Sequence, residues 1–80
     1  MSRARDVVEV VAKALAARPD EVMVTEIDRR GQTVIELSMA PGELGRVIGR
    51  QGRTATALRT LATAAGELDS RKVVVDFQDE

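Results

Sequence analysis

The sequence contains no cysteine, histidine, tryptophan or tyrosine among its 80 residues. Without cysteine the chain forms no disulfide, and without histidine as well the usual zinc ligand sets are missing. The same absences remove the commonest general base and the most reactive nucleophile of enzymes. We therefore expect a protein that is not an enzyme and that takes no metal, no cofactor and no small-molecule substrate.

Aromatic side chains are almost absent, since Phe77 is the only one. RRM, OB and cold-shock domains bind RNA through several exposed aromatic residues on which the bases stack. The sequence therefore gives only weak support to a binding surface of that kind. Phe77 alternates with Val73 and Val75, and this spacing predicts a place for its ring in the core.

The chain also lacks an apolar run long enough to cross a membrane. Its first six residues, MSRARD, are charged, and the apolar stretch that follows is interrupted by Glu9 and Lys13. Such a segment is neither a signal peptide nor a membrane anchor. We predict a cytoplasmic protein without membrane contact, and the length predicts one domain over residues 1–80.

Basic and acidic residues nearly cancel, with 12 of one and 13 of the other, but they are unevenly distributed. The segment 44–66 contains four arginines and no acidic residue, whereas segment 67–80 contains five acidic residues and two basic ones. The arginines of the first segment are Arg46, Arg50, Arg53 and Arg59. A neutral total can therefore hide a local cationic surface, although a solvated helix face with chance clustering gives the same pattern.

Periodicity predicts three helices and three strands. Apolar residues recur at helical spacing over 3–17, and Pro19 ends this helix. A segment rich in β-branched residues predicts a strand over 21–28, and alternating residues predict a second strand over 33–39. Gly31 provides the positive φ that a hairpin turn needs between these strands. A short helix follows, with Pro41 in its first turn and with Leu44, Val47 and Ile48 on one apolar stripe. The last two elements are a helix over 53–65, closed by Gly66, and a strand over 72–77.

The order αββααβ predicts an α+β fold in which one three-stranded sheet carries the helices packed on one face. Between the second and third helices lies Gly49-Arg50-Gln51-Gly52, flanked by Val47-Ile48 and Arg53. Two glycines three residues apart allow a sharp turn with uncovered amides, and the next helix adds its positive dipole end. A phosphate chain can approach such a turn, although glycines that merely cap the two helices are the alternative.

Other glycine-rich phosphate loops do not match this segment. A P-loop ending at Gly52 would need glycine at Val47 and lysine at Arg53. A dinucleotide-binding fingerprint also needs glycine at Val47, and it follows a strand rather than a helix.

The segment Val47-Ile48-Gly49-Arg50-Gln51-Gly52 resembles the KH signature, whose Gly-x-x-Gly loop clamps about four backbone nucleotides. The element order is that of the type II, prokaryotic KH fold. The resemblance covers nearly the whole chain and is greatest to small single-domain bacterial KH proteins of the KhpA type. It implies RNA binding, a link to cell division, cell shape and cell-wall regulation, and pairing either with a second copy or with a larger KH protein of the KhpB (Jag) type.

Two groups of site residues follow. The resemblance implies that single-stranded RNA contacts Ile48, Gly49, Arg50, Gln51, Gly52 and Arg53, and the charge pattern adds Arg46 and Arg59. We expect the bases to lie along Ile48 and the strand over 33–39.

The third helix has a wide apolar arc. Ala55, Leu58, Ala62 and Ala65 form its centre, and Ala57, Leu61 and Ala64 extend it. These last three predict a dimer face, unless the first helix and Leu68 cover them. A non-catalytic protein-interaction module is therefore the alternative function.

Overall fold

The computed structural model describes residues 2–78 and has the predicted order of helices and strands. The elements are α1 (Arg3–Leu15), the 3-10 turn η1 (Pro19–Glu21), β1 (Met23–Arg29), β2 (Gln32–Ser38), α2 (Leu44–Ile48), the 3-10 turn η2 (Arg50–Gly52), α3 (Arg53–Leu68) and β3 (Lys72–Phe77). The α+β class is confirmed. In this region of the chain no helix is both long and apolar enough to span a membrane.

The three strands form one mixed sheet in the order β1-β2-β3. β1 and β2 are antiparallel and joined by a tight hairpin, in which Arg29 pairs with Gln32. The two turn residues, Arg30 and Gly31, have φ values of 51° and 79°, as the twist of a two-residue hairpin requires. β3 is parallel to β2, so α2 and α3 form the crossover between them.

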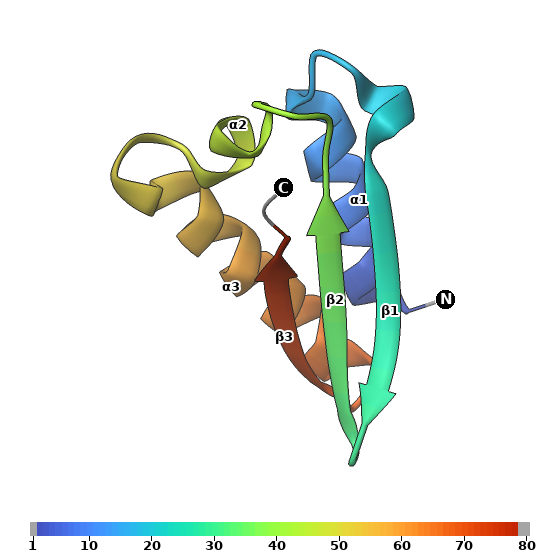
Figure 1. The fold of residues 1–80 in the computed structure, drawn as a ribbon. Helices are drawn as coiled ribbons and strands as arrows, with labels where there is room; N and C mark the ends of the chain where they lie inside the picture. The colour runs from blue at the N-terminus through green and yellow to red at the C-terminus, as the bar shows by residue number, and fades with distance from the viewer. Residues whose placement is uncertain (1, 79–80) are drawn as a thin grey trace.

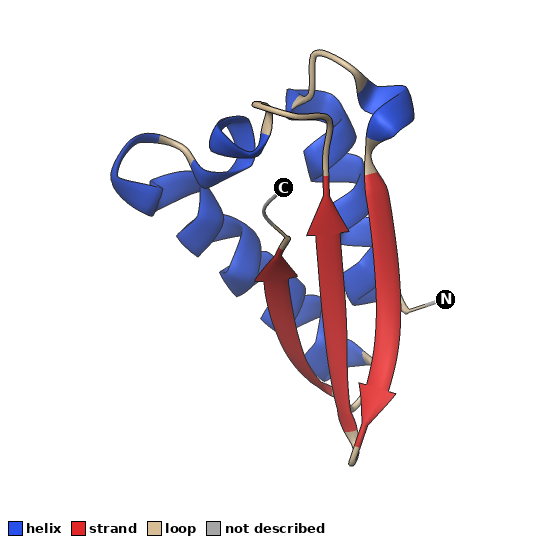
Figure 2. Cartoon of the chain, in the orientation of Figure 1, coloured by secondary structure: helices blue, strands red, loops and turns tan. Residues whose placement is uncertain are grey.

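The helices cover one face of the sheet, as Figures 1 and 2 show. The central strand supplies Ile35 and Leu37 to the core, and both are fully buried against Val8 of α1 and Leu58 of α3. Alternate residues of β2 point to this face, and Met39, which follows the strand, is buried as well.

The predicted ends of two elements are wrong. α1 ends at Leu15 rather than Ala17, and β1 begins at Met23 rather than Glu21, because Pro19 starts a separate 3-10 turn. Pro41 does not lie in the first turn of a helix. It belongs to a tight turn with Gly42, whose φ is 82°, and α2 begins only at Leu44.

The third helix continues through Gly66, which does not close it as predicted. α3 ends at Leu68, and Gly66 is buried where the helix packs against β3. A Cβ at Gly66 would lie 3.0 Å from the carbonyl oxygen of Arg71 and would collide with the side chain of Val73. This glycine therefore allows the helix and strand to approach closely, and a local helix-end signal was the wrong interpretation.

Candidate nucleic-acid interface

The backbone of the loop after α2 requires glycine at position 49. The Gly49 amide closes α2 by donating to the Gly45 carbonyl at 2.9 Å, and its φ of 75° and ψ of 175° lie in a region that only glycine adopts readily. A Cβ there would also come within 2.8 Å of the Thr54 Cβ. Gly49 therefore ends α2 and begins the sharp turn that the two glycines predict.

Gly52 begins α3 in a different way. It is the N-cap of α3 with φ 72° and ψ 13°, and no side chain caps the helix there. Gln51, beside it, is also left-handed at φ 58° and ψ 24°. A Cβ at Gly52 would meet nothing within 4 Å, so the outer side of this residue is open.

The turn leaves amides available on its outer side. The Gly52 amide donates to the Gly49 carbonyl at 3.2 Å, and the Arg53 amide donates to the Arg50 carbonyl. Within residues 2–78, no backbone partner accepts from the amides of Arg50 and Gln51. Together with the uncapped start of α3, these donors form a surface that suits anionic oxygens.

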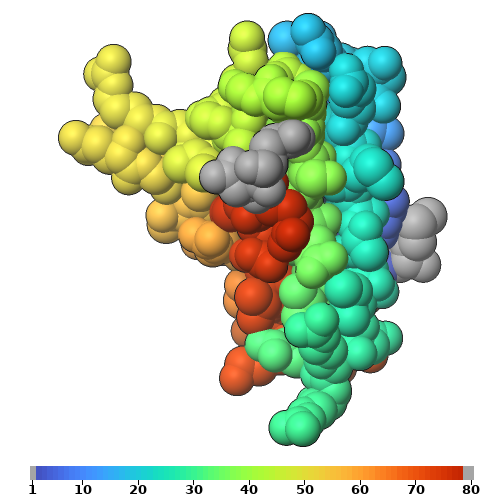
Figure 3. Space-filling view, viewed as in Figure 1, coloured from blue at the N-terminus to red at the C-terminus, as the bar shows by residue number. Residues whose placement is uncertain are grey.

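Three of the four predicted arginines lie in the loop or on α3 and have no acidic partner among the described residues. Arg50, Arg53 and Arg59 are exposed, and no carboxylate of residues 2–78 forms an ion pair with any of them. The Arg53 guanidinium instead donates to the Gln51 side-chain oxygen at 3.0 Å. Figure 3 shows the yellow loop as the part of this face that projects furthest from the body of the domain.

The fourth arginine, Arg46, is held by a carboxylate that the sequence did not single out. Its Nε lies 3.5 Å from Oε1 of Glu43, which is only 7% exposed. The same carboxylate accepts hydrogen bonds from the backbone amides of Ala17 and Arg18. Glu43 therefore fastens the start of α2 to the end of α1, and it partly neutralises Arg46.

The expectation that bases lie along Ile48 and the strand over 33–39 stays a prediction. That strand, β2, lies in the middle of the sheet and is paired with β1 on one side and β3 on the other. The edge on the α3 side belongs to β3, as Figure 1 shows. Ile48 is half-buried between the loop and the fully buried Val47, so it lies at the base of this region.

Phe77 lies at the end of β3 and meets α3. Its side chain is half-buried and packs against the core, as its alternation with Val75 predicts. The guanidinium carbon of Arg59 lies 4.7 Å from the centre of the ring, within the range of a cation–π contact. The sequence places these two residues 18 positions apart and contains no signal that joins them.

The apolar arc of α3 is only partly covered. Ala57 and Ala64 are exposed, and Leu61 is 52% exposed. The alternative that α1 and Leu68 bury these residues is wrong, since Leu68 is itself 72% exposed. Between the two helices lies an open apolar hollow, lined by Val7, Val10 and Val11 of α1 and by Leu61.

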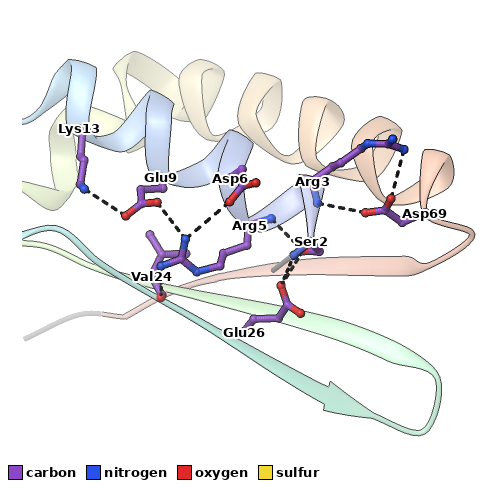
Figure 4. A network of polar contacts seen from close by, with 9 residues as sticks. All are labelled: Ser2, Arg3, Arg5, Asp6, Glu9, Lys13, Val24, Glu26 and Asp69. Carbon is purple, nitrogen blue, oxygen red and sulfur yellow. Dashed lines mark hydrogen bonds and ion pairs between the residues drawn. The ribbon is translucent and has the colours of Figure 1, made fainter.

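The start of α1 carries a polar network of a different kind, drawn in Figure 4. The Ser2 hydroxyl caps the helix by accepting from the Arg5 amide at 3.1 Å, and it donates to the Glu26 carboxylate at 2.6 Å. That hydrogen bond lowers the pKa of Glu26 from its ordinary value, against the opposing effect of partial burial.

Ion pairs extend this network along α1. The guanidinium of Arg5 lies 2.9 Å from Glu9, the ammonium of Lys13 lies 3.1 Å from the same carboxylate, and Arg3 lies 3.2 Å from Asp69. Hydrogen bonds from Lys13 and then Arg5 lower the pKa of Glu9. The arginines of this region are therefore matched by carboxylates.

Comparison with known proteins agrees with this geometry. The family described as "KhpA/KhpB, KH domain" matches residues 5–77. The chain is 50% identical over 77 residues to RNA-binding protein KhpA of Aquifex aeolicus (strain VF5), covering 96% of this chain and 98% of that protein. It is also 50% identical over 72 residues to RNA-binding protein KhpA of Mycobacterium bovis, covering 89% of each chain.

A solved structure shares the fold. The chain superposes on part of Era from Aquifex aeolicus with a TM-score of 0.64 and 20% identity, over 95% of this chain and 29% of that chain. At this identity the likeness speaks for the fold alone.

Proposed function

The chain belongs to the KhpA/KhpB family of KH domains, and from this premise we propose that it binds single-stranded RNA through the loop Gly49–Gly52. The observation that carries the proposal is the combination of unpaired amides, an uncapped helix start and two arginines at the loop, Arg50 and Arg53, without carboxylate partners among the described residues. These groups recognise phosphate oxygens and do not read bases.

The proposed contacts follow the backbone of the strand. The amides of Arg50 and Gln51 and the first turn of α3 hold consecutive phosphates, because the open outer side of Gly52 carries no side chain that would keep the strand away. The guanidinium groups of Arg50 and Arg53 add positive charge on flexible side chains that can follow the phosphates of the strand. Arg46 contributes less, since Glu43 already lies beside it.

A small footprint has a measurable salt dependence. If about three phosphates are neutralised, the slope of log K against log salt for a single strand is about −2. Binding by one domain is then weak, and useful affinity needs a second KH unit through effective concentration. A slope of about −6 or steeper would mean a contact surface far larger than this loop.

The test replaces Arg50 and Gln51 together by aspartate and measures binding of a short single-stranded RNA. The matched control is Arg30→Asp with Gln32→Asp, which makes the same change of charge at the hairpin, at the far end of the molecule in Figure 1. Arg30 and Gln51 both have left-handed backbone, which aspartate tolerates. We expect the loop variant to lose binding and the hairpin variant to keep most of it, and equal loss in both variants would contradict the proposal.

We extend the proposal to the role and the protein partners of the family. The domain acts as a post-transcriptional regulator or RNA chaperone in cell-shape and cell-wall regulation, as a homodimer or with a larger KhpB-type KH protein. Pairing two weak RNA sites supplies the affinity that one loop lacks.

A second candidate function is a protein-interaction module without relevant RNA binding. It is favoured by the open apolar hollow between α1 and α3 and by the exposed Ala57, Leu61 and Ala64. Leu61→Asp tests it, because this change places a charge in the hollow while leaving the loop unchanged. A shift to monomer on a sizing column with RNA binding retained per domain supports dimerisation as a separate property. If the loop variant has no effect on RNA binding and Leu61→Asp abolishes assembly, the module is the better account.

A further inference from the structure

The flank of α3 that begins at the loop continues toward β3. Gly52, Thr56 and Arg59 follow one another at spacings of four and three residues, which places them on one side of the helix. The Thr56 hydroxyl bonds to the Gly52 carbonyl at 3.0 Å, which confirms that the first two are neighbours. From Gly52 to Arg59 the helix rises about 10 Å, within the reach of the about four nucleotides that a KH loop holds.

At the end of this flank the guanidinium of Arg59 lies over the ring of Phe77. The Arg59 guanidinium carbon lies 4.7 Å from the centre of the Phe77 ring, and Phe77 is the only aromatic residue of the chain. No carboxylate among residues 2–78 pairs with Arg59, and its side chain lines an open hollow along α3 with Thr56 and Thr60. The face of the guanidinium away from the ring is therefore available to a ligand.

We propose that Arg59 and Phe77 together form a stacking platform for one base of the bound strand. Bases stack on aromatic rings and on arginine guanidinium planes in single-stranded RNA recognition. The guanidinium is planar in itself and the ring beneath it favours one position, so the base meets a surface that is partly preorganised. The inference rests on the proposed function, and it adds a base contact to a site that otherwise holds only phosphates.

The experiment removes a base rather than a phosphate. A six-nucleotide RNA is compared with the same RNA carrying one abasic nucleotide, moved through each position, on the wild type and on Phe77→Leu. At one position we expect the wild type to lose about tenfold in affinity, the size of one stacked base. Phe77→Leu should bind intact RNA about tenfold more weakly and should be indifferent to the abasic nucleotide at that position.

Two further variants keep the test decisive if Phe77→Leu does not fold. Arg59→Lys keeps the charge and loses the plane, so its salt slope should equal that of the wild type while its sensitivity to the abasic nucleotide disappears. Phe77→Tyr keeps the ring and should keep the sensitivity. If the abasic nucleotide costs the wild type and Arg59→Lys the same at every position, Arg59 merely covers Phe77 and the platform does not exist.

Different results would contradict the proposed function and the stacking platform. If the RNA does not bind the wild type, or if the Arg50→Asp/Gln51→Asp variant binds as well as the wild type, RNA recognition by the loop is wrong. If the loop variant loses binding and the abasic scan shows no coupling, only the platform is wrong.

Discussion

The arginines at the start of α1 and those around the loop have the same chemistry and opposite surroundings. Arg3 and Arg5 each lie beside a carboxylate, and Figure 4 shows these contacts in one network that also ties α1 to β1. Arg50 and Arg53 have no such partner among the described residues. The arginines at the start of α1 form ion pairs within the fold, whereas the arginines at the loop stay available to an external anion.

This difference teaches that the number of basic residues is a poor guide to a binding surface. The whole chain is close to neutral, and six of its twelve basic residues form ion pairs with carboxylates within residues 2–78, namely Arg3, Arg5, Lys13, Arg18, Arg46 and Arg71. A phosphate responds to the charge that remains unmatched near it. The loop region is distinctive because its charge is unmatched and lies beside free amides.

Glu43 is the exception to this difference, because it forms an ion pair with Arg46 close to the loop. Replacing Glu43 should have the largest effect on the stability of the domain. Glu43→Ala leaves the amides of Ala17 and Arg18 without their acceptor, and we expect the free energy of unfolding to fall by about 2–3 kcal/mol in denaturant titrations. Glu21→Ala, at an exposed carboxylate 3.6 Å from Arg18, should change it by less than about 0.5 kcal/mol. Equal effects of the two changes would mean that the buried contacts of Glu43 do not stabilise the fold.

Removing charges from each region should separate binding from stability. Replacing Arg50 and Arg53 by glutamine should weaken RNA binding about 25-fold at 0.1 M salt, about fivefold per phosphate contact, with little change in melting temperature. Replacing Arg3 and Arg5 by glutamine should leave the affinity within about twofold and lower the stability by at most about 1 kcal/mol per ion pair. Calorimetric binding and thermal unfolding on both variants check this, and the opposite pattern would refute the division.

The Ser2 cap at the start of α1 should contribute to stability and not to RNA binding. Ser2→Ala removes the acceptor for the Arg5 amide and the donor to Glu26, and we expect a loss of about 1 kcal/mol in stability with unchanged RNA affinity. Ser38→Ala, at a half-buried serine of β2, is the matched control and should be nearly neutral. A Ser2 variant as stable as the control would show that the cap does not contribute.

Lowering the pH should reduce the stability contributed by the carboxylates near α1 but should not change RNA affinity at the loop. Of the predicted effects, this one is the smallest. The pKa values of Glu9 and Glu26 are lowered in the folded protein, so their stabilisation is present above the ordinary value of 4.5 and is lost as the pH falls through the lower folded values. Glu26→Gln should flatten part of this acid dependence in unfolding curves. RNA affinity should stay constant between about pH 6 and 8, because guanidinium groups do not titrate there and the chain has no histidine. A titration of binding near pH 6.5 would contradict the assignment of arginine and amide contacts.

The sequence predicted the elements and the loop because both depend on local signals. Gly49 and Gly52 stand where the backbone needs positive φ, and the alternation around Ile35 and Leu37 follows the burial of one sheet face. The prediction for Gly66 was wrong, because a glycine that ends a helix and a glycine that allows close packing cannot be told apart from the sequence alone.

Contacts between distant positions could not be read from the sequence. Glu43 meets amides more than 20 residues earlier, and Arg59 meets Phe77 across the fold. The order of the strands, with β3 at the edge of the sheet, was also hidden, because strand order is a property of the assembled sheet. These are the features that decide which arginine is free and where a base can rest.

The most direct test follows backbone amide signals by NMR while a six-nucleotide single-stranded RNA is added at low ionic strength. The account predicts progressive shifts for residues 49–53 and unchanged signals for residues 29–32 at the hairpin. Amides of residues 49–53 that stay in place at saturating RNA would contradict it.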